Sequence, residues 1–163
     1  MPNSKNSFLI LGIDPGYAIT GYGIVRHDRQ KVAAVAQGAI MSKPAVPYEE
    51  RLKKIFVGLT QLIKKYRPDA MAIEKLFFAA NTATVMRVGE ARGVAILAAG
   101  IAGIPVREFT PLQIKQAITG DGRADKLQMQ RMVKVLLKLP AVPRPDDVAD
   151  ALAVGICGGI KNF

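Results

Sequence analysis

The sequence predicts an α/β domain built on a mixed five-stranded sheet with helices on both faces. The first 41 residues carry strand patterns only, which is typical of an antiparallel meander. After them, helical and strand patterns alternate, which is typical of parallel strands joined by right-handed helical connections. A length of 163 residues at 50% apolar content is enough for one core. We therefore expect residues 1–163 to form a single domain, with residues 1–7 as a flexible leader.

The three N-terminal strands are predicted from apolar runs and turn residues. Phe8–Asp14 is a continuous apolar run, as expected of a strand buried on both faces. Thr20–Arg26 and Lys31–Met41 follow as two further strands. The intervening segment, His27-Asp28-Arg29-Gln30, has turn-forming composition. It places His27 in what we expect to be an exposed turn.

The middle of the chain changes to a helical period. Pro47–Tyr66 repeats apolar residues every three or four positions and carries charges on its other face, so it predicts an amphipathic helix. Asp69–Glu74 predicts a short buried strand that ends on an acid. Thr82–Ala102 is rich in Ala, Val and Leu and contains three glycines, which permit close packing of a helix at some cost in propensity.

The C-terminal part is predicted to contain one more strand and the remaining helices. The strand is Pro105–Phe109, and the helix Pro111–Thr119 follows a capping residue, Thr110. Lys126–Leu139 is a basic amphipathic helix. The last element is an apolar helix over Asp146–Ile160.

Composition narrows the classes of function. The chain has 23 Lys and Arg against 13 Asp and Glu, a net charge of +10, which favours a polyanionic partner such as nucleic acid. A single cysteine, Cys157, excludes an intramolecular disulfide, and the single histidine, His27, disfavours a Ser-His-Asp device. We find neither a signal peptide nor an uninterrupted apolar stretch of membrane-spanning length, so we expect a cytoplasmic protein.

Four acids stand where carboxylates are costly. Two strands end on Asp14 and Glu74, and the last helix carries Asp147 and Asp150 at an i, i+3 spacing that places them on one face. Each acid alone has an ordinary explanation, such as a turn at Asp14-Pro15-Gly16 or a favourable charge at a helix start. Desolvating unpaired carboxylates is expensive, however, and three elements each contribute acids to sheet ends in a basic protein.

Clustered carboxylates with neither Cys nor His nearby select hard cations. Mg²⁺ is the cation we expect, as a pair of ions in each site by the charge balance of four acids, and Mn²⁺ can substitute. Two such ions can activate a water molecule and stabilise the leaving oxygen in phosphodiester hydrolysis. The acids therefore predict nuclease chemistry.

Motifs over nearly the whole chain resemble one family. "GIDPG" with Asp14, "AIEKLFF" with Glu74, "GEARGVAI", "LLKLP" and "DDVADALAV" resemble, in this order, the RuvC family of bacterial Holliday-junction resolvases. The resemblance implies an RNase H-like fold and a homodimer. It also implies Mg²⁺-dependent paired nicks in a four-way junction, which leave 5′-phosphate and 3′-hydroxyl ends. A branch-migration complex of the RuvA and RuvB kind is the implied partner.

The resemblance assigns roles to individual residues. The catalytic and metal-binding tetrad of the family falls on Asp14, Glu74, Asp147 and Asp150. Asp146 is an extra acid directly before the third member, which leaves open which of the two neighbours binds metal. We choose Asp147 for its i, i+3 relation to Asp150.

Candidate DNA-binding residues follow from the same resemblance and from charge. The base-contacting wedge of the family falls on Phe77, with Phe78 as a second candidate, although either ring could equally be core. Lys115 and Lys126 match lysines that the family uses near the scissile phosphate. Further candidates for contacts with the DNA backbone are Arg87, Arg123, Arg92, Arg107, Arg131 and Lys134.

Two expectations concern packing. The helix Thr82–Ala102 is apolar over a wide arc and carries few charges, so we expect it to form part of a dimer interface. Gly21 and Gly23 allow a close approach to their strand, an approach that DNA could make.

Three alternatives stay open at this stage. "DPGYAITG" can be interpreted as the phosphate loop of an actin-like ATPase, although that class needs two lobes around the nucleotide. A protein that binds junctions or duplexes without chemistry would also be basic, but four acids would oppose DNA binding unless metals neutralised them. The nearest alternative is another RNase H-like nuclease that acts on RNA or on hybrid duplexes.

Overall fold

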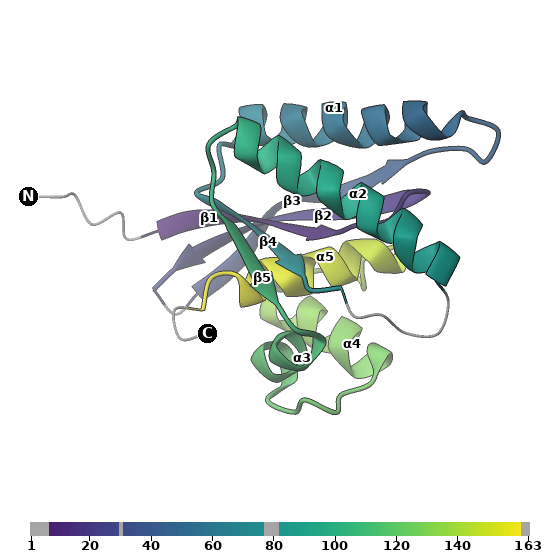
Figure 1. The fold of residues 1–163 in the computed structure, drawn as a ribbon. Helices are drawn as coiled ribbons and strands as arrows, with labels where there is room; N and C mark the ends of the chain where they lie inside the picture. Colours follow the sequence, from purple (N-terminus) through teal and green to yellow (C-terminus); the bar gives the residue numbers. More distant parts are fainter. Residues whose placement is uncertain (1–6, 30, 77–81, 161–163) are drawn as a thin grey trace, which may run out of the picture.

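The computed structural model describes residues 7–29, 31–76 and 82–160, and they form a layered α/β fold (Figure 1). A mixed five-stranded sheet in the order β3-β2-β1-β4-β5 separates two layers of helices. The strands are β1 (Ser7–Asp14), β2 (Ile19–Asp28), β3 (Lys31–Met41), β4 (Ala70–Glu74) and β5 (Val106–Phe109). The helices are α1 (Tyr48–Tyr66), α2 (Thr82–Ile101), α3 (Pro111–Thr119), α4 (Lys126–Leu136) and α5 (Asp146–Cys157). The predicted fold class is confirmed.

The pairing of the strands brings two of the predicted acids to one edge of the sheet. β2 pairs antiparallel with both β1 and β3, as the meander predicts. β1, β4 and β5 run parallel, and Ile13 of β1 stands opposite Ile73 of β4. The next residue on each strand is an acid, Asp14 on β1 and Glu74 on β4. Parallel strands therefore deliver both carboxylates at the same end.

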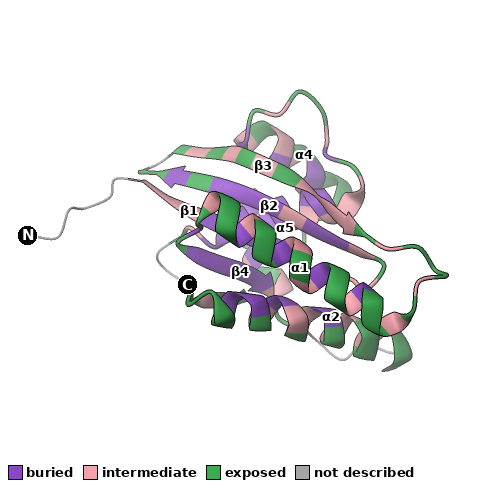
Figure 2. Cartoon of the chain, turned by 90° about the horizontal axis from the view of Figure 1, so that it is seen from above, coloured by how far each residue is buried: buried purple, intermediate pink, exposed green. Residues whose placement is uncertain are grey.

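The helices cover both faces of the sheet, and each face has its own core. α1 and α2 pack on one face, over a cluster that includes Leu11, Ile13 and Leu59. α5 packs on the other face, against a cluster that includes Ile10 and Leu152, with α3 and α4 outside it. Because neighbouring residues of β1 point to opposite faces, Ile10 and Leu11 enter different cores. Figure 2 shows the buried side of α1 turned toward the sheet and its exposed side turned away.

α5 lies unusually close to β1 and β2 because both strands carry glycines beneath it. A Cβ atom added at Gly12 would lie 2.1 Å from the carbonyl oxygen of Ala151, and one added at Gly21 would lie 2.0 Å from that of Asp147. A Cβ at Gly23 would meet the Leu152 side chain at 2.6 Å. The close approach expected at Gly21 and Gly23 is real, but the helix makes it. The suggestion that DNA makes it is wrong.

His27 does not lie in an exposed turn. β2 continues to Asp28, and the His27 side chain is 6% exposed. Its ring stacks on Phe8 with centroids 5.1 Å apart, and its Nε2 atom lies 3.0 Å from the carbonyl oxygen of Gly155, to which the N–H tautomer donates. Burial lowers the pKa of His27 below its ordinary value. The turn residues are therefore fewer than composition predicted, and the histidine supports α5.

Helix ends follow local chemistry. Thr110 caps α3 in a reciprocal capping box, as predicted, and Asp125 does the same for α4. α4 ends at Leu136 rather than at Leu139, since Lys138 adopts a left-handed φ of 52°. α5 likewise ends at Cys157, before two glycines, rather than at Ile160. In the part of the chain that the structure describes, no helix is both long enough and apolar enough to cross a membrane.

Candidate active site

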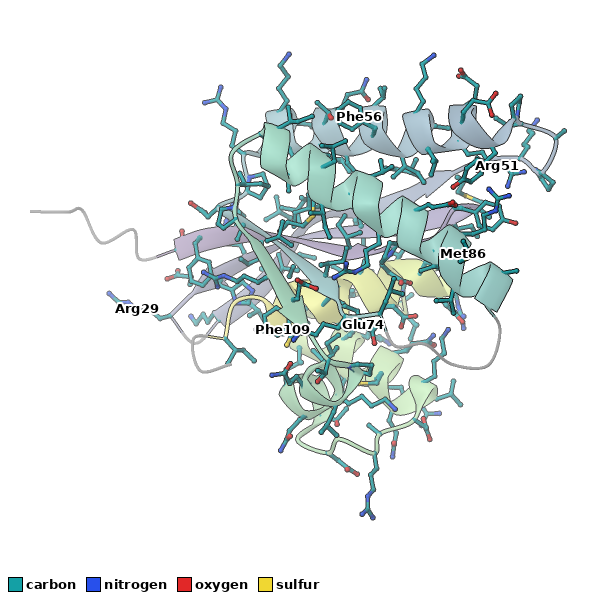
Figure 3. All side chains as sticks on the ribbon, viewed as in Figure 1. Arg29, Arg51, Phe56, Glu74, Met86 and Phe109 are labelled. Carbon is teal, nitrogen blue, oxygen red and sulfur yellow. The ribbon has the colours of Figure 1, made fainter. Side chains whose placement is uncertain are left out.

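The four predicted acids lie near one another at the carboxyl edge of β1 and β4. Asp14 pairs with Gly21 in the register of β1 and β2. The backbone of Asp147 rests directly over Gly21, so the start of α5 lies beside Asp14. Asp150 follows one helical turn later. Figure 3 shows Glu74 at the end of β4, close to α5. The fold thus gathers acids that are up to 136 positions apart in the sequence.

The electrostatic state of Asp14 shows how closely the acids interact. Burial is the largest influence, followed by the negative charges of Asp150, Asp147 and Glu74, and together they raise the pKa of Asp14 from 3.8 to about 7. Lys126 acts in the opposite direction. Near neutral pH this carboxyl group is therefore poised between its charged and neutral forms. A cation bound there would favour the charged form.

Two further acids share this environment. Burial and the charge of Asp150 raise the pKa of Glu74, while Lys115 opposes them. Burial also raises the pKa of Asp150, and Lys126 is the main opposing charge. Both lysines predicted to lie near the scissile phosphate are thus electrostatically coupled to the acids.

Two adjoining pockets open at this edge and share Glu74 and Pro111. One, of about 250 Å³, is lined by Asp14 and by residues that follow β4. The other, of about 210 Å³, has Lys115, Lys126 and Asp150 on its polar side. Its apolar wall consists of side chains from α3, α4 and α5, namely Ile114, Met129, Ala153 and Val154. Acids and lysines from five elements therefore line one continuous surface.

Asp146 occupies a different position from its neighbour Asp147. Its Oδ2 atom forms an ion pair with Lys126 Nζ at 3.2 Å, and its other carboxylate oxygen pairs with the Arg144 guanidinium. The hydrogen bond from Lys126 lowers the pKa of Asp146 more than any other contact does. Asp147, by contrast, is one of the charges that raise the pKa of Asp14. This difference supports Asp147 rather than Asp146 as the member of the tetrad.

The donor chemistry of the four acids fits a hard divalent cation. All four offer carboxylate oxygens, and burial together with the charges of the other three acids raises the pKa of Asp14, with Lys126 as the opposing charge. Within residues 7–29, 31–76 and 82–160, no three acid, histidine or cysteine side chains already converge closely enough to hold one ion. Like charges repel, and a bound cation would offset that repulsion and favour the approach of the carboxylates.

The predicted DNA contacts fall into three groups. Phe77 and Phe78 lie outside the described residues. Arg87 is engaged within the fold, since its guanidinium lies 3.8 Å from the centre of the Tyr48 ring and 3.8 Å from Glu90 Oε2. Arg123 is exposed in the loop before α4. Arg123 and the lysines are thus presented toward solvent or the pockets, whereas Arg87 joins α1 to α2.

Two of the other candidate arginines also have structural partners. Arg92 pairs with Glu108 and donates from Nε to the carbonyl oxygen of Glu74 at 3.2 Å, so it braces the end of β4. Arg107 donates to the carbonyl oxygen of Gly158 at 2.8 Å and holds the end of α5. Charge alone had suggested DNA contacts for both.

Sequence reasoning missed one polar residue behind the site. Gln130 is 4% exposed on α4, and its side chain hydrogen bonds to Asp146. Its i, i+4 spacing from Lys126 was a visible signal, because that spacing puts both side chains on one helical face. The spacing alone could not identify Asp146 of α5 as the partner of Gln130.

The fold defines a class, the RNase H-like domains, and the acids at its edge offer the ligand type that metal-dependent nucleases use. The model of the family described as "Crossover junction endodeoxyribonuclease RuvC" matches residues 10–158. The chain belongs to the RuvC family, which implies divalent-metal dependence.

Individual relatives agree with this assignment. The chain is 54% identical over 149 residues to the crossover junction endodeoxyribonuclease RuvC of Desulforamulus reducens, covering 91% of each chain. It is 52% identical over 162 residues to the protein of the same name from Rubrobacter xylanophilus, covering 99% of this chain and 90% of that one.

Solved structures extend the likeness to the fold. The structure superimposes with a TM-score of 0.87 and 34% identity on "T. thermophilus RuvC in complex with Holliday junction substrate", covering 92% of each chain. The yeast mitochondrial Holliday junction resolvase Ydc2 has a TM-score of 0.64 at 16% identity, covering 91% of this chain and 76% of that one. The Ydc2 likeness is one of fold alone.

Proposed function

We propose that this chain is a structure-selective endonuclease that resolves four-way DNA junctions by hydrolysing phosphodiester bonds. The observation that carries the proposal is the environment of Asp14. Its carboxyl group is coupled to three other acids, and two lysines line the adjoining pocket. Relatives named as crossover junction endodeoxyribonucleases, and a relative solved with a Holliday junction substrate, support the choice of DNA substrate.

The metal we propose is Mg²⁺, with two ions in each site and Mn²⁺ as a substitute. Asp14, Glu74, Asp147 and Asp150 would hold them, because carboxylates are the ligands that such hard cations prefer. When bound, the ions supply an activated water molecule and stabilisation of the leaving 3′-oxygen, which leaves 5′-phosphate and 3′-hydroxyl ends.

The chain's own residues bind and orient the DNA. Lys115 and Lys126 point their positive charge at the pocket beside Glu74 and Asp150. There they would attract the scissile phosphate and offset the charge that develops on its oxygens during attack. Arg123 would contribute a contact with the DNA backbone, and Phe77 and Phe78 are retained as candidate wedges at the crossover.

A symmetric pair of cuts requires two sites, and we propose that α2 forms the interface of a homodimer. Its outer face exposes Met86, Leu97 and Ile101, at 60%, 56% and 67%. Gly93 and Gly100 lie on the same face with open space before them. Large apolar side chains and small residues on one helical face suit close packing against a second copy of α2. Association with a branch-migration complex of the RuvA and RuvB kind is carried over from the family resemblance.

Cleavage of a synthetic four-way junction tests the proposed function. With Mg²⁺ we expect wild-type protein to nick opposed strands at matching positions, and a chelator should abolish this. Asp14→Asn should reduce the rate at least about 1,000-fold, because an amide holds a cation far less well than a carboxylate. Glu50→Gln, which removes an exposed acid on α1, is the matched control and should cleave normally. Equal cleavage by wild type and Asp14→Asn would reject the assignment.

Hybrid duplexes and single strands in the same assay test the nearest alternative. A faster reaction on an RNA–DNA hybrid than on the junction would favour an RNase H-like nuclease of other specificity.

A further inference from the structure

One ion pair joins the first residues of α4 and α5 at the edge of the site. Lys126 begins α4, and Asp146 begins α5. The Lys126 ammonium lies 3.2 Å from Asp146 Oδ2 and 3.7 Å from Asp150 Oδ2. Asp146 and Asp150 stand one helical turn apart on α5, so the ammonium bridges both carboxylates.

The two acids that share this ammonium have different surroundings. Asp150 is coupled to Glu74 and Asp14 and belongs to the proposed tetrad. Asp146 is not among the charges that shift the pKa of Asp14. Instead, it accepts bonds from Arg144 and from the buried amide of Gln130. Both donors restrain the Asp146 carboxylate, which makes it a more stationary acceptor for Lys126 than a carboxylate with no other partner would be.

A stationary acceptor matters because Lys126 has a long, flexible stem. Its side chain is 57% exposed, and free rotation about four bonds would spread the ammonium over a wide volume. If Asp150 turns toward a cation, as the proposed function requires, the ammonium loses the more distant of its two acceptors. Asp146 then becomes the acceptor that keeps Lys126 at the pocket.

We propose that Asp146 is a positioning residue that holds the Lys126 ammonium beside the pocket where the scissile phosphate binds. The expected effect of Asp146 on the cleavage rate rests on the proposed function, because a restrained ammonium can favour cleavage only if a phosphate is cleaved there. Its structural part, that Asp146 restrains Lys126, can be tested without metal or DNA. Gln130 and Arg144 take part indirectly, by fixing the carboxylate.

The first experiment measures the reactivity of lysine amines in the presence of a chelator. Brief acetylation followed by mass spectrometry reports how readily each ammonium leaves its ion pair. Asp146→Asn should raise the labelling of Lys126 about threefold and leave Lys53 unchanged, since loss of the nearer of its two carboxylate partners leaves the amine accessible to the reagent more often. Lys53, which pairs with Glu50 at 3.3 Å, is the internal reference, and Glu50→Gln should raise labelling at Lys53 alone. Unchanged labelling of Lys126 would overturn the proposal.

The second experiment measures junction cleavage by single-turnover kinetics. Asp146→Asn should lower the cleavage rate about tenfold, with junction affinity under chelation kept within about twofold, because misplacing a catalytic cation costs rate more than binding. Asp146→Glu should recover most of the rate. In a Lys126→Ala background, Asp146→Asn should cause no further loss. Equal losses in both backgrounds would mean that Asp146 acts independently of Lys126 and would overturn the proposal.

The two experiments separate failure of this proposal from failure of the proposed function. If wild-type protein leaves every junction intact, the proposed function fails, and the expected effect of Asp146 on the cleavage rate fails with it. The labelling result still decides whether Asp146 restrains Lys126. If wild type cleaves and Asp14→Asn does not, the function stands, whichever way the Asp146 variants behave.

Discussion

At the scale of single residues, the site concentrates negative charge where ionisation of the carboxyl groups lowers the stability of the fold. Burial and three neighbouring acids raise the pKa of Asp14 to about 7. In an unfolded chain the same group would have a pKa near 3.8. The folded protein therefore binds this proton more tightly than the unfolded chain does. The contribution of Asp14 to stability consequently falls as pH rises from about 4 to about 7, and it stays lower above that range.

This linkage makes a prediction about Asp14→Asn that is independent of cleavage. In chelating buffer at pH 8, the variant should be more stable than wild type by about 2 kcal/mol, because it removes a carboxylate that the fold disfavours. At pH 4 the folded-state carboxyl group is neutral and the unfolded-state group is only partly ionised, so the difference should nearly vanish. Urea denaturation at pH 4, 6 and 8 measures it. Wild type and variant with parallel pH profiles would show that Asp14 is not strongly coupled to its neighbours.

At the scale of elements, the packing of α5 against the sheet does the most to position the acids of the site. Its residues from Val148 to Cys157 are buried apart from Asp150. Glycines on both sides of the contact allow the helix to pack close to the sheet. A Cβ atom added at Gly155 of the helix would lie 2.8 Å from the Val25 side chain and 3.5 Å from the backbone of Gly12. His27 and Arg107 hold the carbonyl groups near its C-terminus. The helix start, with its acids, is thereby fixed over β1 and β2.

Gly12→Ala should show how much depends on this contact. The added methyl group would meet backbone atoms of α5, which cannot rotate away as a side chain can. We expect a loss of about 3 kcal/mol in unfolding free energy, at the upper end for overpacking of a core. Thermal unfolding followed by circular dichroism is the measurement. A variant as stable as wild type would contradict the close packing of α5.

At the scale of the whole molecule, the proposed paired cuts require two sites. Leu97 and Ile101 of α2 are exposed, and Figure 2 shows the exposed side of α2 turned away from the sheet. A two-fold interface through this face would give each active site a symmetric counterpart. One copy alone offers a single carboxylate centre and could nick only one strand at a time.

Leu97→Glu tests the dimer. A charge at the centre of an apolar interface should raise the dimer dissociation constant at least about 100-fold, since its desolvation is uncompensated. Analytical ultracentrifugation measures this directly, and single nicks should replace paired cuts on the junction. Met41→Glu, on an equally exposed apolar residue of β3, is the control and should remain dimeric. A Leu97→Glu variant that still forms dimers would place the interface elsewhere.

Local sequence determined the elements and part of the site, and the physical reason is periodicity. Repeats of two and of three to four residues encode which side of a strand or helix is buried, so the strands, the helices and the strand ends at Asp14 and Glu74 followed directly. The i, i+3 spacing of Asp147 and Asp150 likewise needed no partner to be recognised. The tetrad itself remains a proposal, as do the wedge residues Phe77 and Phe78.

Tertiary structure decided everything that depends on which distant surfaces meet. Whether His27 is exposed, and what approaches Gly21, depends on the seating of α5 against β2. The separate role of Asp146 depends on Lys126, 20 positions earlier, coming within 3.2 Å across the α4–α5 contact. Periodicity records that a side is buried but not what buries it. Only packing assigns partners to these residues.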